Sequence, residues 1–369
     1  MGVYVDNEDA STPLKRERSD LTPSLDSVAD NGFYFSNAFS SSNFTLAGLT
    51  SVLTGRYGSS TGVIGWSTGV KDDIPLLPEI LGYYGYDTAG FTIDAPSGFR
   101  PDYGLHRGFQ TMHIIPSPRD TPDGRFRPGE IGEGGAAAEP VLEWLKANED
   151  EAETDRPRFM MFHTRGAHFP FVITDEGAED DPTEMTQLLW EAGMAQAAST
   201  ANRAMPGMSG GTAQEGVVEF EGPDPLQVQV AKLGEPAELM WKQRYREAVG
   251  RMDIDLRRVL DGLKNSGRAD KTILVVVADH GESLNDHGEL LHGDAYFAGV
   301  VNVPMVIKVP GLEGKTTALD GLVSHVDVLP TILDLVGAKV PAGIDGTSMV
   351  PLLTGESEAI RHTTLIEGG

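Results

Sequence analysis

The alternation of apolar and polar positions along the chain predicts strands that alternate with helices. Residues 273–277 are apolar at every position, which is typical of a strand covered on both faces. Just before them, residues 240–263 place apolar side chains at helical spacing along one stripe. Further strands are expected near 33–38, 88–92, 158–163 and 304–309, and helices at 22–32, 44–55, 74–81, 136–147 and 328–335. This pattern predicts an α/β fold with a mostly parallel central sheet that helices cover on both faces.

One segment breaks the alternation. Residues 175–235 are rich in Glu, Asp, Gly, Pro, Ala and Met and show little periodicity. We interpret them as an acidic insertion over the functional face of a single domain that spans residues 1–369.

The composition and net charge of the chain limit the classes of molecule that it can bind. The chain has 369 residues, of which 40% are hydrophobic and 23% charged, as in an ordinary globular protein. Its 29 basic and 55 acidic residues give a net charge of 29 − 55 = −26, so nucleic acids and anionic membranes are excluded as default partners. A small anionic substrate would need local positive charge or a bound cation. The acidic excess is also typical of proteins from high salt.

Several absences bear on chemistry and location. The chain has no cysteine, which excludes disulfides and thiol catalysis. No apolar run is long enough to span a bilayer, and no signal peptide is visible at the start, which favours a cytoplasmic location. The pattern carries no signal for an oligomeric state.

Candidate chemistry follows directly after the apolar run 273–277. Asp279, His280 and Gly281 fall at the carboxyl end of the expected strand, where ligand sites lie in open α/β sheets. A carboxylate beside an imidazole, followed by a glycine that permits a sharp turn, can supply metal ligands. An Asp that caps the next turn beside an incidental His is the other interpretation, and for an isolated pair it is the commoner one.

Motifs along nearly the whole chain resemble those of the sulfatase family. Thr45 is the first residue of an expected helix that ends at Thr54-Gly55. In the sulfatase signature the nucleophile likewise begins a helix that ends in a Thr-Gly pair. Other matching segments follow in family order: 22–26 with 35–38, 81–90 (L-G-Y-Y-G-Y-D-T-A-G), 104–109 (G-L-H-R-G-F), 166–170, 252–253, 278–282, 303–305 and 325–346. The resemblance implies an alkaline-phosphatase-like fold and a metal-dependent hydrolase or transferase of sulfate or phosphate esters.

The same resemblance implies roles for individual residues. Thr45 would be the nucleophile, and Asp279 and His280 would hold one divalent ion, with Ca²⁺, Mg²⁺, Mn²⁺ and Zn²⁺ all compatible. His168 and His292 stand where the family places histidines that contact the ester or its leaving group. His287 has two interpretations, a supporting substrate contact or an exposed residue. Taken singly, each histidine is more often structural.

The sequence also departs from the sulfatase signature. Sulfatases mature a Cys or Ser followed by Pro and then Ser-Arg into formylglycine, whereas this chain has Thr45 and, in place of the Arg, Leu49. A directly attacking Thr is similar to the phosphodiesterase and phosphoethanolamine-transferase relatives, which form a phospho-Thr intermediate. This favours phosphate over sulfate esters. The alternative is a catalytically impaired sulfatase-like fold that binds an anion or a protein partner.

A second departure concerns the ends of the chain. The family opens with a strand that ends in acidic metal ligands, and residues 1–4 resemble the piece just after them. We therefore expect a chain truncated at both ends, because the family usually continues beyond the position of Gly369. In the alternative, residues 3–5 are that strand and Asp6 is the ligand, assisted by Asp9.

One further motif competes with Thr45. Residues 65–69 (G-W-S-T-G) fit the G-x-S-x-G nucleophile elbow, with Ser67 as the nucleophile. That motif requires a strand before it and a helix after it, but glycine-rich and charged residues flank it here. A surface turn is the favoured interpretation.

Overall fold

The computed structural model describes residues 20–65, 68–93, 98–115, 138–147, 156–168, 228, 230–232, 234–293, 296–312 and 317–368. Asp6 and Asp9, Ser67 and nearly all of the expected insertion 175–235 lie outside the described residues. The described neighbours of Ser67 do not form a strand–turn–helix unit. The short helix α3 (Gly58–Thr61) precedes it, and residues 68–71 after it form neither strand nor helix.

The described strands form two larger sheets and two short pairs. The first sheet has the order β10 (Thr317–Leu319), β1 (Phe33–Phe35), β9 (Met305–Lys308) and β6 (Leu274–Val277), with β9 antiparallel to both of its neighbours. The second has the order β4 (Thr111–Ile115), β3 (Asp87–Ile93) and β5 (Arg158–His163), all parallel. The short pairs are β2 (Ala38–Phe39) with β11 (Val323–Ser324), and the hairpin of β7 (Ser283–Leu284) and β8 (Leu290–Leu291).

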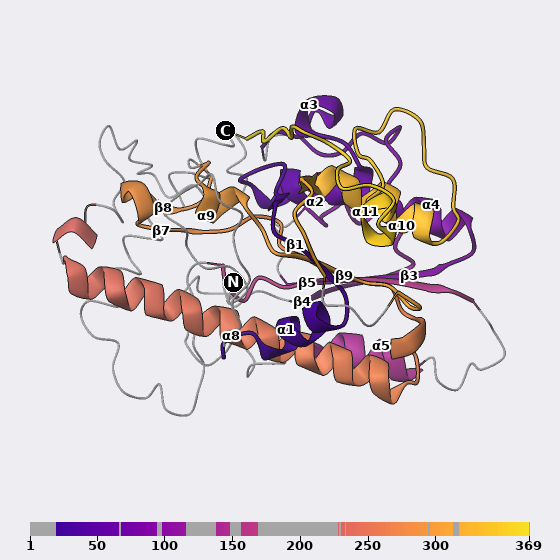
Figure 1. Ribbon diagram of the computed structural model, residues 1–369, viewed down its shortest axis with the longest axis horizontal. Coiled ribbons are helices and arrows are strands. Elements are labelled where there is room, and N and C mark those ends of the chain that lie inside the picture. Colours follow the sequence, from indigo (N-terminus) through magenta and orange to yellow (C-terminus); the bar gives the residue numbers. More distant parts are fainter. Residues whose placement is uncertain are drawn as a thin grey trace.

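Helices cover both sides of the strands (Figure 1). One layer contains α1 (Pro23–Asp30), α5 (Glu139–Ala147) and the long α8 (Glu235–Asn265), and the opposite layer contains α2 (Thr45–Thr54), α4 (Leu77–Tyr83), α10 (Val328–Leu335) and α11 (Val350–Thr354). The short elements are α9 (Ala298–Val301), η4 (Ala269–Lys271), η5 (Asp286–Gly288) and η6 (His325–Asp327). The expected α/β architecture with helices on both faces is confirmed.

Apolar side chains fill the space between each helix layer and the strands. Leu46 and Leu53 of α2 pack in one buried cluster with Leu329 and Leu333 of α10. On the other side, residues of α8 and α5 form a cluster with Phe91 of β3. Burial of such side chains is the main driving force that fixes the layers. None of the described helices is long and apolar enough to cross a membrane.

The apolar run 273–277 is less enclosed than its pattern predicts. It forms β6, but every residue of β6 is only half-buried and the strand pairs with antiparallel β9. In the described part of the chain β6 ends its sheet, just as β5 ends the other sheet. A strand at a sheet edge has one partner strand, which accounts for the half-burial. Apolar clusters nevertheless pack on both faces, with Val275 and Val277 in one and Leu274 and Val276 in the other. The expected coverage of both faces is therefore confirmed, and only the expected parallel pairing was wrong for this strand.

Candidate active site

Helix α2 presents Thr45 at its first turn. Thr45 is the first residue of the helix, follows extended Phe44, and is only 4% exposed. The first N–H groups of a helix have no partner within it and carry partial positive charge, which suits a bound anion. At the other end Gly55 adopts the left-handed conformation with φ 67° and ends the helix, as expected from the sequence.

The loop after β6 lies directly against α2. A Cβ atom on Gly48 would come within 2.7 Å of the Asp279 carbonyl oxygen, so only glycine permits this close approach without displacement. The approach brings His280 to the nucleophile candidate, with 3.1 Å between Thr45 Oγ1 and His280 Nε2. The structure thus brings together three residues that the sequence resemblance had implied.

The hydrogen bonds of His280 define which ring nitrogen carries the proton. His280 Nδ1 lies 2.8 Å from the Gly281 carbonyl oxygen, which can only accept, so Nδ1 must donate. Burial lowers the pKa of His280, which favours the neutral ring. Nε2 of the neutral ring then has a free lone pair, and the Thr45 hydroxyl donates to it.

Several histidine side chains surround the Asp279 carboxylate. Its Oδ2 lies 3.5 Å from His280 Nε2 and 3.9 Å from His163 Nε2. Burial acts to raise the pKa of Asp279, but the surrounding histidines outweigh it and hold the pKa well below the usual range. Asp279 is therefore a carboxylate at neutral pH.

Two further histidines near Asp279 were not predicted as site residues. His163 is the last residue of β5, and His325 opens η6 and donates from Nε2 to the Ala278 carbonyl oxygen at 2.9 Å. Burial lowers the pKa of each to about 4, so both rings are neutral at pH 7. The signal for His163 was present in the sequence, because a polar residue ends an apolar strand at its carboxyl end.

His292 and His168 complete the cluster. The His292 ring centroid lies 4.1 Å from that of His280 and 5.0 Å from that of His168. His292 Nδ1 lies 2.9 Å from Oε1 of Glu282, a buried carboxylate that the sequence did not single out. His168 follows β5 on a loop that Met252 of α8 holds, because the Ala167 N–H donates to Met252 Sδ at 3.0 Å.

His287 occupies a different place. It lies in η5 at the tip of the β7–β8 hairpin and stacks on Phe297, with 4.0 Å between the ring centroids. Its φ of 71° and those of Asn285 and Leu291 are positive, which is uncommon for residues other than glycine. The structure therefore places His287 against Phe297, whereas His168, His292 and His280 form a chain of ring contacts that ends at Thr45.

Asp279 and His280 have the donor chemistry of divalent-cation ligands. One offers an anionic oxygen and the other an unprotonated nitrogen, so both fit a divalent cation. Among the residues that the structure describes, no group of three or more His, Asp or Glu side chains is arranged to hold a metal ion. These two residues account for only part of a coordination shell.

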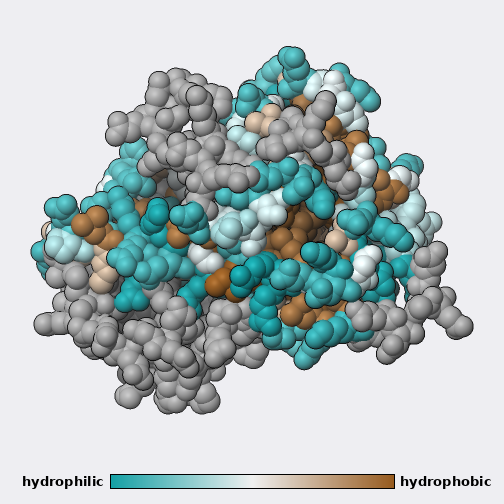
Figure 2. Space-filling view, turned by 60° about the horizontal axis from the view of Figure 1, so that its bottom comes forward, coloured by the Kyte–Doolittle hydropathy of each residue, from teal (hydrophilic) through white to brown (hydrophobic). Residues whose placement is uncertain are grey.

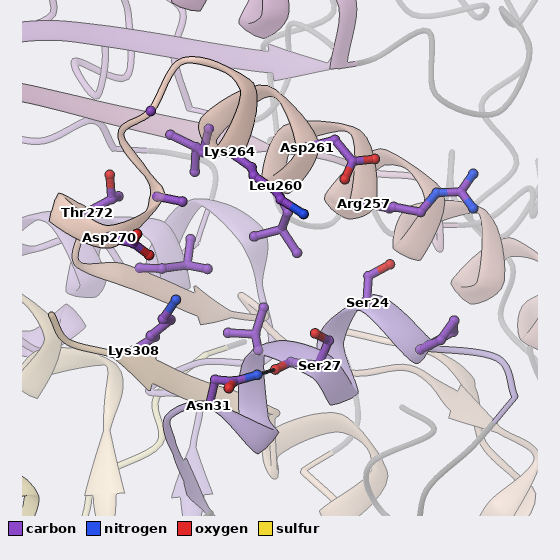
Figure 3. Close-up of a pocket in the computed structure, with 16 residues that line it drawn as sticks. Ser24, Ser27, Asn31, Arg257, Leu260, Asp261, Lys264, Asp270, Thr272 and Lys308 are labelled. Atoms are coloured by element: carbon purple, nitrogen blue, oxygen red, sulfur yellow. Dashed lines mark hydrogen bonds between the residues drawn. The ribbon is translucent and has the colours of Figure 1, made fainter. Parts of the chain in front are cut away.

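A separate groove lies between α1 and the carboxyl-terminal half of α8 (Figure 3). Its volume is about 800 Å³, and its walls include Leu274 at the start of β6 and Lys308 at the end of β9. It therefore lies at the end of β6 opposite to Asp279 and shares no lining residue with the site around Thr45. Lys264 and Asp270 line it as well, so its charges are mixed. The helix face brought forward in Figure 2 is largely hydrophilic, with apolar patches between the polar side chains.

Comparisons with solved structures agree with this fold. The phosphonate monoester hydrolase SpPMH from Silicibacter pomeroyi superposes with a TM-score of 0.64 at 20% identity, over 91% of this chain and 72% of that one. A 2-O GAG sulfatase gives a TM-score of 0.66 at 20% identity, over 94% of this chain and 74% of the other.

Several relatives by sequence are sulfatases. The extracellular sulfatase SULF-1 homolog of Drosophila melanogaster is 31% identical over 147 residues, which is 38% of this chain but only 13% of that protein. The N-acetylglucosamine-6-O-sulfatase of Bacteroides thetaiotaomicron is 24% identical over 391 aligned positions, 91% of this chain and 67% of the relative. The sulfatase family model matches residues 4–338. The chain therefore belongs to the sulfatase family.

Proposed function

We propose that this chain hydrolyses small anionic sulfate or phosphate esters with Thr45 as the nucleophile. The observation that carries the proposal is the hydrogen bond between Thr45 Oγ1 and the unprotonated Nε2 of His280. An unprotonated imidazole nitrogen beside a hydroxyl is the arrangement in which a weak nucleophile becomes reactive. The position of Thr45 at the start of α2 adds N–H groups that favour an anionic group next to it.

The reaction follows from these positions. Thr45 Oγ1 loses its proton and attacks the sulfur or phosphorus atom, and the bond to the leaving oxygen breaks. That oxygen takes up a proton and departs as the alcohol, so a covalent Thr ester remains. Water then hydrolyses this ester and restores the hydroxyl. The N–H groups of the first turn of α2 stabilise the charge on the non-bridging oxygens. His168 and His292 are the imidazoles available to the ester or to the leaving oxygen.

Sulfatase family members generally use a divalent metal ion. Asp279 and His280 would hold it here, His280 through Nε2, because Nδ1 is committed to the Gly281 carbonyl. With the ion bound, the cation in place of the Nε2 lone pair would lower the pKa of the Thr45 hydroxyl, and it would neutralise charge on the ester. Direct attack by Thr favours phosphate over sulfate, because a Thr side chain cannot mature to formylglycine.

The test is hydrolysis of an aryl sulfate and an aryl phosphodiester, each with Ca²⁺, Mg²⁺, Mn²⁺ or Zn²⁺ added. The variant Thr45→Ala should lose at least about a thousandfold in kcat, because the nucleophile is gone. Thr50→Ala is the matched control, since Thr50 lies on the same helix, is buried, and its hydroxyl donates to the Leu46 carbonyl, away from the ester. Turnover that survives in Thr45→Ala but depends on the metal would overturn the role of Thr45.

A non-catalytic, anion-binding fold is the second candidate, and Leu49 favours it. Leu49 is 4% exposed and packs in the core with Leu46 and Leu53, so it offers no charge to an anion. In that case a folded protein would turn over neither ester, yet sulfate or phosphate would raise its Tm in a concentration-dependent way.

A further inference from the structure

We propose that Glu282 is a positioning residue that fixes the proton of His292 on Nδ1 and so leaves Nε2 facing the ester. The catalytic consequence rests on the proposed function. The position of the proton can be measured without turnover, so the two claims can fail separately.

The contact between the two side chains is direct and enclosed. Glu282 Oε1 lies 2.9 Å from His292 Nδ1, and the side chains of Glu282 and His292 are 4% and 14% exposed. In the part of the chain that the structure describes, His292 is the side chain that pairs with this carboxylate. A buried carboxylate without a charged or hydrogen-bonded partner is strongly disfavoured, so the bond to His292 matters to both residues.

Chemistry then determines the tautomer. A carboxylate oxygen can only accept a hydrogen bond, so His292 Nδ1 must carry the proton. Imidazoles that act in metal and catalytic sites are commonly held in one tautomer by a carboxylate at the other nitrogen. A neutral histidine free in water prefers the proton on Nε2, so Glu282 reverses the ordinary preference.

The backbone on either side of both residues is held in place. The Glu282 N–H donates to the Gly299 carbonyl oxygen at 3.2 Å. Leu291, which precedes His292, is buried with a φ of 67°. On the other side, Asn43 Nδ2 donates to the Gly293 carbonyl oxygen at 2.7 Å. Strained backbone of this kind persists where surrounding contacts over-determine it, and it is common at functional sites.

The location of the ring gives this tautomer its role. The His292 ring lies beside both His280 and His168, within the cluster that surrounds Thr45. With Nδ1 committed to Glu282, Nε2 is the ring atom that remains for an ester oxygen. Glu282 touches no reacting atom in this scheme and acts through His292.

The first test is nitrogen-15 NMR of the histidine rings in the full chain, with His292→Asn used to assign the signal. We expect the His292 proton on Nδ1 in the unaltered protein. Glu282→Leu should move the proton to Nε2, the position preferred in water, because the acceptor at Nδ1 is gone. A proton on Nε2 in the unaltered protein, or a signal that Glu282→Leu leaves unchanged in a folded protein, would overturn the proposal. The unaltered protein alone gives a decisive result if the variant does not fold.

The second test is kinetic. Glu282→Gln should lower kcat about 10- to 100-fold with little change in KM, as for loss of a partner that orients a histidine. Asp286→Asn makes the same chemical change on an exposed carboxylate of the same hairpin, with a side chain 44% exposed, and should leave kcat unchanged. Unchanged kcat in Glu282→Gln would contradict the positioning role. If the NMR result holds while neither ester is hydrolysed, the tautomer stands and the proposed function falls.

Discussion

At the residue scale, groups that can only accept a hydrogen bond fix the protons of the histidines around Thr45. His280 Nδ1 donates to the Gly281 carbonyl, His325 Nε2 donates to the Ala278 carbonyl, and His292 Nδ1 donates to the Glu282 carboxylate. Burial keeps His280 and His325 neutral by lowering their pKa values. Thr45 therefore meets an unprotonated nitrogen, which is the property that the proposed chemistry needs.

A buried ion pair outside the site gives a prediction about stability. The Asp327 carboxylate is fully buried, accepts the Ser324 and Thr347 N–H groups, and pairs with Arg361. Burial raises the pKa of Asp327, and Arg361 opposes that rise. Arg361→Met should lower the free energy of unfolding by about 3 kcal/mol, because it leaves a buried charge unpaired.

Urea denaturation of Arg361→Met and of the double variant Arg361→Met/Asp327→Asn measures this effect. The double variant should recover part of the loss because it also removes the charge. A single variant that unfolds at the same urea concentration as the unaltered chain would show that the pair adds no stability.

At the element scale, the sequence predicted the bounds of those helices that depend on local sequence features. Helix α10 has the predicted bounds, and α2 begins at Thr45 and stops at Gly55, because periodicity and a C-terminal glycine are local features. The short β7 and β8 strands escaped prediction, since two residues show no period. The antiparallel partner of β6 was equally invisible, because strand pairing is a long-range choice.

Gly48 tests how closely two of these elements must approach. Gly48→Ala would push α2 from the loop after β6, because the new Cβ would lie 2.7 Å from the Asp279 carbonyl oxygen. We expect kcat to fall about a hundredfold, as displacements of about 1 Å in a catalytic site commonly cause. Gly82→Ala is the control, since Gly82 lies in α4 with open space where its Cβ would be. Full activity in Gly48→Ala would show that the contact does not set the geometry.

At the scale of the whole molecule, residues far apart in the sequence form the site. Thr45 comes from α2, His163 from the end of β5, and Asp279 from the loop after β6. The family resemblance pointed to Thr45, Asp279, His280, His168 and His292, and the structure brings these residues together. The resemblance gave no such role to His163, His325 or Glu282. Their proximity to the site depends on the order of the strands and on the β7–β8 hairpin.

The pH dependence of global unfolding tests Asp255, which packs in α8 away from the site. Burial raises its pKa to about 6, from 3.8. The folded pKa lies above the unfolded one, so ionisation favours unfolding as pH rises. The free energy of unfolding should therefore fall by up to about 3 kcal/mol between about pH 4 and pH 7 through this group.

Asp255→Asn removes this titration and should gain stability relative to the unaltered chain as pH rises across that range. Asp261→Asn, which changes an exposed carboxylate of the same helix, should follow the unaltered chain. If the free energies of unfolding of Asp255→Asn and of the unaltered chain changed in parallel with pH, the raised pKa of Asp255 would be contradicted.

The most direct test of the central claim is to trap the covalent Thr ester. The protein would be mixed with an aryl phosphodiester and a divalent metal ion, quenched in acid within one turnover, and analysed by mass spectrometry of its peptides. The account predicts a phosphoryl adduct on Thr45 that is absent from Thr45→Ala. Rapid turnover in the unaltered protein with no adduct at Thr45, or with the adduct on another residue, would contradict it.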